Sequence, residues 1–259
     1  MNSKSHNKKQ ESLRKAAAWI SRNAKEIGEG SAALAVSLLL EKIKEGEAPS
    51  QSQVRKTATI LFADVVGFTS LSESLDPEFV TELINSLWEG IDLLVVKWGG
   101  TLDKHIGDAV MALWGDIVTQ EDDVERSVQC ALDMLEWLRV FNGSFKFSDG
   151  SSVSMPLSLR VGIHTGMVLI GPIGTIGERS AIGDTVNTAA RIQAAAKPGS
   201  VLVTEPVFRA VSGIFDFEDA GCIEMKGKSE PIAAYAATRV KNRDRKSTRL
   251  NSSHGKLTR

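Results

Sequence analysis

The sequence has few of the features that define secreted, membrane-spanning or nucleic-acid-binding proteins. Only two of its 259 residues are cysteine, which provides no disulfide framework and predicts two free, mostly buried thiols in a reducing compartment. The longest apolar run near the N-terminus covers residues 32–40, whereas a membrane-spanning helix needs about twenty residues. The N-terminus also lacks the apolar centre of a signal peptide. These absences predict a cytoplasmic protein with no membrane span.

Charge is unevenly distributed along the chain, although the net charge is only −1. Residues 51–240 contain 15 Lys and Arg against 25 Asp and Glu. Residues 1–50 carry a net charge of +3, and residues 241–259 carry +6. An acidic body lacks the basic face that nucleic-acid binding requires. We therefore expect no nucleic-acid partner.

Composition and hydrophobic periodicity divide the chain into three parts. Residues 1–50 have apolar residues at helical spacing and predict a helical extension or linker, followed by a boundary rich in small and polar residues. Residues 54–240 form the body. Residues 241–259 have almost no apolar side chains and predict a disordered basic tail.

The body alternates strands with long amphipathic helices. We expect three main helices, the first from Asp76-Pro77 to Gly99-Gly100, the second over 122–140 and the third from Asp184 onward. We expect strands over 57–62, 101–105 and 109–114, a hairpin over 157–170 that turns at Thr165-Gly166, and closing strands after residue 200. This order predicts an α+β fold with a mostly antiparallel sheet and helices on one face.

Two aspartates end or follow strand-like apolar runs. Asp64 lies in TILFADVVGFTSLSE, and Asp108 lies in the tight turn of GGTLDKHIGDAVMALWG. A carboxylate at the edge of a buried strand is costly unless a positive group meets it. If the two strands are neighbours, both carboxylates can share divalent cations such as Mg²⁺ or Mn²⁺, which indicates phosphate chemistry. Taken singly, each aspartate is equally compatible with an ordinary turn or cap.

Two further segments carry polar side chains suited to anions. In IGDTVNTAARIQ, Asn187 and Arg191 are four residues apart and share one helical face between small alanines. An amide and a guanidinium suit an oxygen that gains negative charge during a reaction, although a solvated surface arginine is the alternative. In MKGKSEP, Lys226 and Lys228 flank a glycine, where a lysine can reach a phosphate or simply lie in solvent.

Five segments in order make residues 54–240 resemble the class III adenylate and guanylate cyclase catalytic domain. They are FADVVGFTSLSE, DKHIGDAVMALWG, LRVGIHTGMVLIGPIG, AIGDTVNTAARIQAAAKPGSVLVT and MKGKSEP. The resemblance implies a ferredoxin-like core that works as a head-to-tail homodimer, with sites at the interface filled from both protomers. The implied activity is that of an adenylate cyclase, which converts ATP to 3′,5′-cyclic AMP and pyrophosphate with two Mg²⁺ or Mn²⁺ ions.

The resemblance also implies roles for individual residues. Asp64, Asp108 and the backbone of Val65 match the metal ligands, and Val66, Gly67, Phe68 and Thr69 match the segment that holds the triphosphate. Lys104 and Ser180 match the base-reading positions. Asn187 and Arg191 match the pair that stabilises the transition state, and Lys226 matches the phosphate-binding lysine.

The base-reading positions favour adenine. Guanylate cyclases typically carry an acidic residue where this chain has Lys104. Ser180 stands where many members have Asp or Thr, and its hydroxyl keeps both a donor and an acceptor. A guanylate cyclase and a catalytically silent nucleotide-binding dimer are the alternatives, and silent members usually lose a metal aspartate or the arginine that this chain retains.

Overall fold

The computed structural model describes residues 53–152, 157–173, 178–224 and 230–241. The expected N-terminal extension and the tail from residue 242 onward lie outside the described residues, as do Lys226 and Lys228. Among the helices of the described part, none combines the length and apolar character needed to cross a bilayer.

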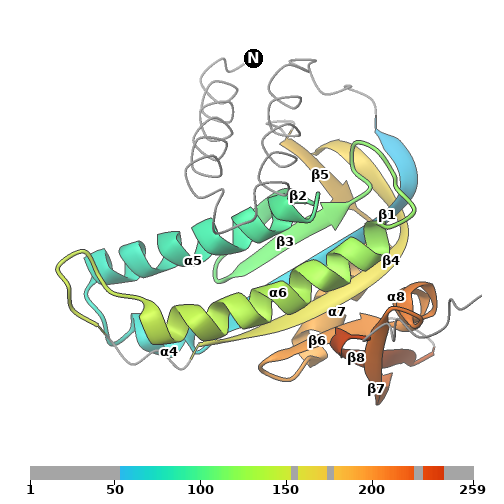
Figure 1. The fold of residues 1–259 in the computed structure, drawn as a ribbon. Helices are drawn as coiled ribbons and strands as arrows, with labels where there is room; N and C mark the ends of the chain where they lie inside the picture. Colours follow the sequence, from blue (N-terminus) through green and yellow to red (C-terminus); the bar gives the residue numbers. More distant parts are fainter. Residues whose placement is uncertain (1–52, 153–156, 174–177, 225–229, 242–259) are drawn as a thin grey trace, which may run out of the picture.

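One sheet of eight strands forms the centre of the described part of the chain (Figure 1). The strands are β1 (Val54–Val66), β2 (Thr101–Ile106), β3 (Ala109–Trp114), β4 (Ser158–Ile173), β5 (Glu178–Ile182), β6 (Ser200–Thr204), β7 (Phe215–Ile223) and β8 (Ile232–Val240). Their order is β2-β3-β1-β4-β6-β8-β7, with β5 paired to β4. Neighbouring strands are antiparallel except for β4 and β6, which run parallel. The predicted α+β class with a mostly antiparallel sheet is confirmed.

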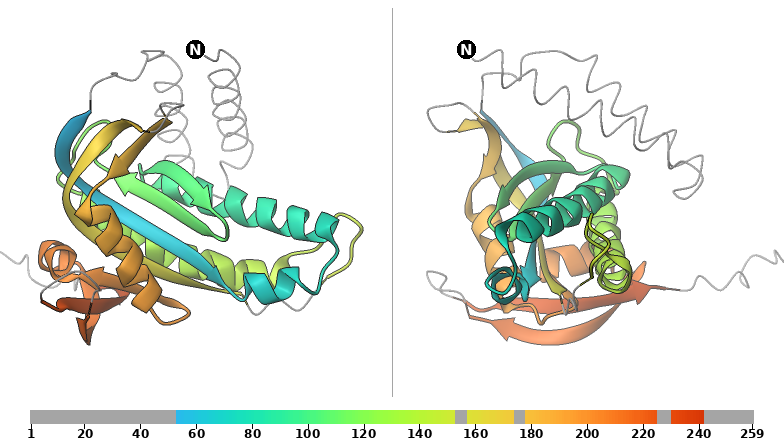
Figure 2. Two further views of the ribbon diagram at one scale, coloured as in Figure 1. Left: turned by 180° about the vertical axis from the view of Figure 1, so that it is seen from behind. Right: turned by 90° about the vertical axis from the view of Figure 1, so that its left-hand side faces the viewer.

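Helices cover both faces of this sheet. They are α4 (Phe68–Ser72), α5 (Pro77–Lys97), α6 (Asp123–Ser144), α7 (Asp184–Ala195) and α8 (Glu205–Val211). Along β1, Leu61, Ala63 and Val65 join the core cluster that contains α5 and α6, whereas Ile60 and Phe62 join a second cluster with α7. Figures 1 and 2 show α6 and α7 on opposite sides of the sheet. Because β1 is apolar on both faces, both faces need a cover, and the expectation of helices on one face must be corrected for α7.

The helix boundaries follow local signals in the sequence. Asp76 precedes α5 in an extended conformation, and Pro77 occupies its first position, where a missing N–H costs nothing. The same helix stops before Gly99, whose φ of 70° belongs to the left-handed region that favours glycine. The third helix begins at Asp184, as predicted.

The predicted hairpin over residues 157–170 is wrong, because β4 runs through it as a single strand. β1 pairs with β4 from Val54 opposite Ile170 to Val66 opposite Ser158 without interruption. Gly166, the expected turn residue, serves packing instead. A Cβ at this position would lie 2.8 Å from the hydroxyl oxygen of Thr185 at the start of α7.

Gly162 fixes the close approach of α7 to β4. A Cβ at Gly162 would lie 2.1 Å from the backbone nitrogen of Gln193 and 2.7 Å from the carbonyl oxygen of Ala189. Backbone atoms cannot rotate away, so we expect Gly162→Ala to lower the free energy of unfolding by about 3 kcal/mol, at the upper end of overpacking costs. Chemical denaturation measures this loss.

Gly143 provides the matched control for that measurement. It lies in α6, and a Cβ there would meet no atom within 4 Å. Gly143→Ala should be neutral or stabilising by up to about 1 kcal/mol, because alanine has the higher helix propensity. Equal stability of the Gly162→Ala protein and the wild type would contradict the close packing of α7 on β4.

The two cysteines differ in their surroundings. Cys130 lies fully buried in α6, and burial raises the pKa of its thiol well above the usual value. Cys222 is exposed on β7, so the prediction of buried thiols is correct for Cys130 alone. The protonated Cys130 thiol acts as a small apolar group in the core and not as a nucleophile.

Candidate functional site

Asp64 and Asp108 lie at the same end of two adjacent strands. β1 and β3 are antiparallel neighbours, and Asp64 stands opposite Ala109, the residue that follows Asp108. The backbone N–H of Val65 donates to the backbone carbonyl of Asp108 at 3.0 Å. The condition for a shared site, that the two strands are neighbours, is therefore met. Two carboxylates at one end of neighbouring strands are hard oxygen donors, which fit Mg²⁺ or Mn²⁺.

Asp64 has a cationic partner that the sequence did not reveal. Arg160 lies opposite Asp64 on β4, and its Nη2 donates to Asp64 Oδ2 at 2.5 Å. The Asp64 side chain is 17% exposed, so this ion pair offsets part of the cost of placing the carboxylate at the strand end. The case for a cation consequently depends on the pairing of Asp64 with Asp108. The only signal in the sequence was that Arg160 is the single Lys, Arg, Asp or Glu within residues 158–173.

The segment from Val65 to Thr69 forms a tight connection beside the aspartates. β1 ends at Val66, Gly67 adopts a φ of 90°, and α4 begins at Phe68. Phe68 packs against the main core, which holds this connection to the body. The hydroxyl of Thr69 lies 3.4 Å from Asp108 Oδ2 and so connects the segment to the second aspartate. The proposed triphosphate segment and metal ligands are thus contiguous.

Asn187 and Arg191 occupy the exposed face of α7. Thr188, Ala189 and Ile192 of the same helix are buried against the sheet, whereas Asn187 and Arg191 are exposed. Within the described residues, neither side chain forms a hydrogen bond or ion pair with another group. Both are therefore available to a ligand or to a second chain.

Lys104 and Ser180 meet at one carboxylate that sequence reasoning missed. Ser180 Oγ donates to Asp103 Oδ2 at 2.7 Å, and Lys104 Nζ lies 3.2 Å from the same oxygen. The Asp103 side chain is 2% exposed, and that of Lys104 is 47% exposed. The structure thus brings the two predicted base-reading residues together from β2 and β5. The only hint of this contact in the sequence was that an acidic residue, Asp103, directly precedes Lys104. Such a residue cannot be distinguished by sequence alone from an acid in a surface turn.

A second ion pair holds β5 in place beside Ser180. Arg179 donates through Nε and Nη2 to Asp116 Oδ1, at 3.0 and 2.7 Å. Lys56, near the start of β1, donates to the backbone carbonyl of Asp116 at 3.0 Å. Because Asp116 is buried, this arrangement ties the start of β1, the loop after β3 and β5 to one another.

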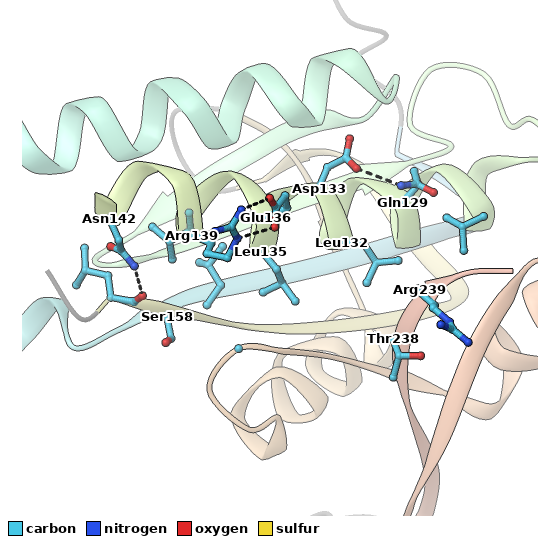
Figure 3. A pocket seen from close by; sticks show the side chains of 15 residues that line it. Gln129, Leu132, Asp133, Leu135, Glu136, Arg139, Asn142, Ser158, Thr238 and Arg239 are labelled. Carbon is cyan, nitrogen blue, oxygen red and sulfur yellow. Dashed lines mark hydrogen bonds and ion pairs between the residues drawn. The ribbon is translucent and has the colours of Figure 1, made fainter. Parts of the chain in front are cut away.

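A groove of about 630 Å³ lies between α6 and the ends of β4 and β8, away from these residues (Figure 3). None of the predicted site residues lines it. Arg139 bonds Glu136, and Gln129 bonds Asp133, so several of its polar groups are already paired. The groove is therefore not the candidate site.

The fold is that of a nucleotidyl cyclase catalytic domain. The adenylyl cyclase CyaB from P. aeruginosa matches with a TM-score of 0.70 and 31% identity, covering 74% of this chain and 98% of that one. The guanylyl cyclase Cya2 matches with a TM-score of 0.67 and 28% identity, covering 74% of this chain and 96% of that one.

Sequence comparison leads to the same family. Residues 50–238 match the model for the adenylate and guanylate cyclase catalytic domain, and the chain belongs to this family. The adenylate cyclase of Anabaena cylindrica is 32% identical over 204 residues, or 76% of this chain and 38% of that protein. The guanylate cyclase soluble subunit beta-2 of Rattus norvegicus is 34% identical over 191 residues, or 73% of this chain and 27% of that protein. The chain thus spans well under half the length of these relatives, and both kinds of cyclase are among them.

Proposed function

We propose that this domain is a cytoplasmic adenylate cyclase, which converts ATP to 3′,5′-cyclic AMP and pyrophosphate at the interface of a head-to-tail homodimer. The observation that carries the proposal is the placement of Asp64 and Asp108 at one end of the sheet in a chain of the cyclase family. The exposed pair on α7, which has no side-chain partner among the described residues, supports a site completed by a second protomer.

In this proposal Asp64, Asp108 and the backbone carbonyl of Val65 hold two divalent cations, Mg²⁺ or Mn²⁺. When bound, these ions would lower the pKa of the ribose 3′-hydroxyl and neutralise the departing pyrophosphate. The backbone of Val66 to Thr69 would hold the triphosphate, and Lys226 would add a mobile positive charge. The protein forms no covalent bond with the substrate, so its contribution is placement and electrostatics.

Asn187 and Arg191 of the second protomer would meet the reacting phosphate. A guanidinium donates up to five hydrogen bonds in a fixed plane and remains charged at all relevant pH values. It therefore stabilises the oxygen on which charge accumulates as the bond to pyrophosphate breaks. The amide of Asn187 would orient the ribose in the same transition state.

Lys104 favours adenine over guanine on chemical grounds. The N1 position of adenine accepts a hydrogen bond, whereas N1 of guanine carries a hydrogen. An ammonium group can only donate, so it complements adenine at that position and repels the guanine N1–H. A guanylate cyclase and a silent nucleotide-binding dimer remain the rival functions.

A cyclic-nucleotide assay tests the proposal. We expect cyclic AMP from ATP with Mg²⁺ or Mn²⁺, a slower reaction with GTP, and no product after chelation of divalent ions. Specific activity should rise with protein concentration, because a site shared between protomers is complete only in the dimer. Faster turnover of GTP would favour the guanylate cyclase, and the absence of product from both nucleotides would favour the silent dimer.

A further inference from the structure

We propose that Asp103 is the positioning residue that sets the preference for ATP over GTP. It would do so by fixing the direction of the Ser180 hydroxyl hydrogen and the position of the Lys104 ammonium. The inference rests on the proposed function, since it assigns to Lys104 and Ser180 the contact with the base.

A β-bulge places Asp103 where it can serve both residues. Leu102 pairs with Ala112 of β3 and Lys104 pairs with Met111, which leaves Asp103 without a partner in the ladder. A bulge re-aims the side chain of the extra residue and bends its strand. Here it directs a carboxylate inward, 2% exposed, while the side chain of the next residue, Lys104, stays half-exposed.

Asp103 connects two strands that do not pair with each other. β2 pairs with β3 at the edge of the sheet, whereas β5 pairs with β4. A single carboxylate oxygen nevertheless contacts Ser180 Oγ of β5 at 2.7 Å and Lys104 Nζ of β2 at 3.2 Å. The neighbouring ion pair between Arg179 and Asp116 also joins β5 to the loop after β3.

The charge of Asp103 determines whether the Ser180 hydroxyl acts as a donor or as an acceptor toward other groups. An ionised carboxylate only accepts hydrogen bonds, so the hydroxyl must donate its hydrogen to Asp103. The lone pairs of Oγ then remain for any other partner. Ser180 is 5% exposed, so little water is available to replace the carboxylate as acceptor.

A Ser180 hydroxyl that acts as an acceptor toward the base complements adenine and does not complement guanine. The exocyclic N6 amino group of adenine donates hydrogen bonds, which the Oγ lone pairs can accept. The O6 atom of guanine is an acceptor and would face the same lone pairs without a hydrogen between them. Ser180 as acceptor and Lys104 as donor therefore together complement adenine N6 and N1, at the positions where guanine presents the reverse pattern.

The test replaces Asp103 by asparagine, which keeps the size and removes the charge. The Asn amide can donate to Ser180 Oγ, which frees the hydroxyl hydrogen to point at the base. We expect Asp103→Asn to reduce the ATP-to-GTP preference about tenfold, the effect of one hydrogen bond of the charged class. The preference is measured as the ratio of dissociation constants with Ca²⁺ in place of Mg²⁺, and as the ratio of kcat/KM values.

Asp92→Asn is the matched control. Asp92 bonds His105, the residue after Lys104, at 3.0 Å, so it is a more exposed carboxylate that bonds a side chain of the same strand. Its removal should leave the ATP-to-GTP ratio unchanged. If Asp103→Asn weakens both nucleotides equally, Asp103 has a structural role only and the inference is overturned.

The single variant Ser180→Ala keeps the inference testable even if Asp103→Asn is poorly folded. Ser180→Ala should reduce the same ratio, and adding Asp103→Asn to it should reduce the ratio by less than the two single effects combined, because both variants remove the one hydrogen bond between Ser180 and Asp103 while the contact of Asp103 with Lys104 is lost only in the second. An unchanged ratio in Ser180→Ala would refute the inference. The ratio of dissociation constants can be measured without turnover. An inactive wild type would therefore count against the proposed function, whereas the binding ratios of the variants would still test the inference.

Discussion

Replacement of Asp108 by asparagine is expected to reduce cyclase turnover by more than about 10³-fold, because a ligand of the divalent cations loses its charge. The free energy of unfolding should change little. Asp108 is joined to the fold mainly through its backbone carbonyl, which accepts the Val65 N–H at 3.0 Å and is retained in the variant. Steady-state assays with ATP and Mg²⁺, together with chemical denaturation, separate the two effects.

Asp216→Asn is the control for this variant. Asp216 lies on β7, at the opposite edge of the sheet from β2 and β3, and pairs with Arg239 at 2.7 Å. A surface ion pair of this kind contributes at most about 1 kcal/mol, and activity should stay at the wild-type level. If Asp108→Asn kept substantial activity, Asp108 would be an ordinary turn residue.

Replacement of Arg191 by alanine should lower kcat about 10²- to 10³-fold, the usual effect of removing one preorganised donor to a developing negative charge. The residue is exposed on α7 and has no side-chain partner among the described residues, so stability should be unaffected. Arg209→Ala is the control, since Arg209 is an exposed helical arginine on α8 that pairs with Glu205. A nearly normal kcat of the Arg191→Ala enzyme would contradict the proposed role of Arg191 in stabilising the transition state.

Local signals in the sequence were sufficient for most of the fold. Pro77 and Asp184 begin their helices as predicted, because proline, caps and glycines act within a few residues. The error at Gly166 arose because glycine serves turns and close packing alike. Only the tertiary contact with Thr185 distinguishes these uses, and it joins residues from different elements.

The candidate site was predicted in part. The sequence allowed Asp64 and Asp108 to share a site if their strands were neighbours, and the structure shows that they are, while the catalytic roles stay predictions. Arg160 and Asp103 were missed, because their importance comes from partners on other strands. Asp64 stands opposite Arg160 on the neighbouring strand β4, and Ser180 reaches Asp103 from β5, a strand that does not pair with β2.

Complementation between two inactive variants tests the central claim most directly. Asp108→Asn and Arg191→Ala proteins are each assayed alone and then after mixing and re-equilibration of subunits. In a head-to-tail dimer each mixed pair has one intact site, so the mixture should recover roughly a quarter of wild-type activity, since half of the random dimers are mixed. If the mixture is as inactive as its components, the metal aspartates and the α7 pair do not form a site across two protomers, and the proposed head-to-tail cyclase is contradicted.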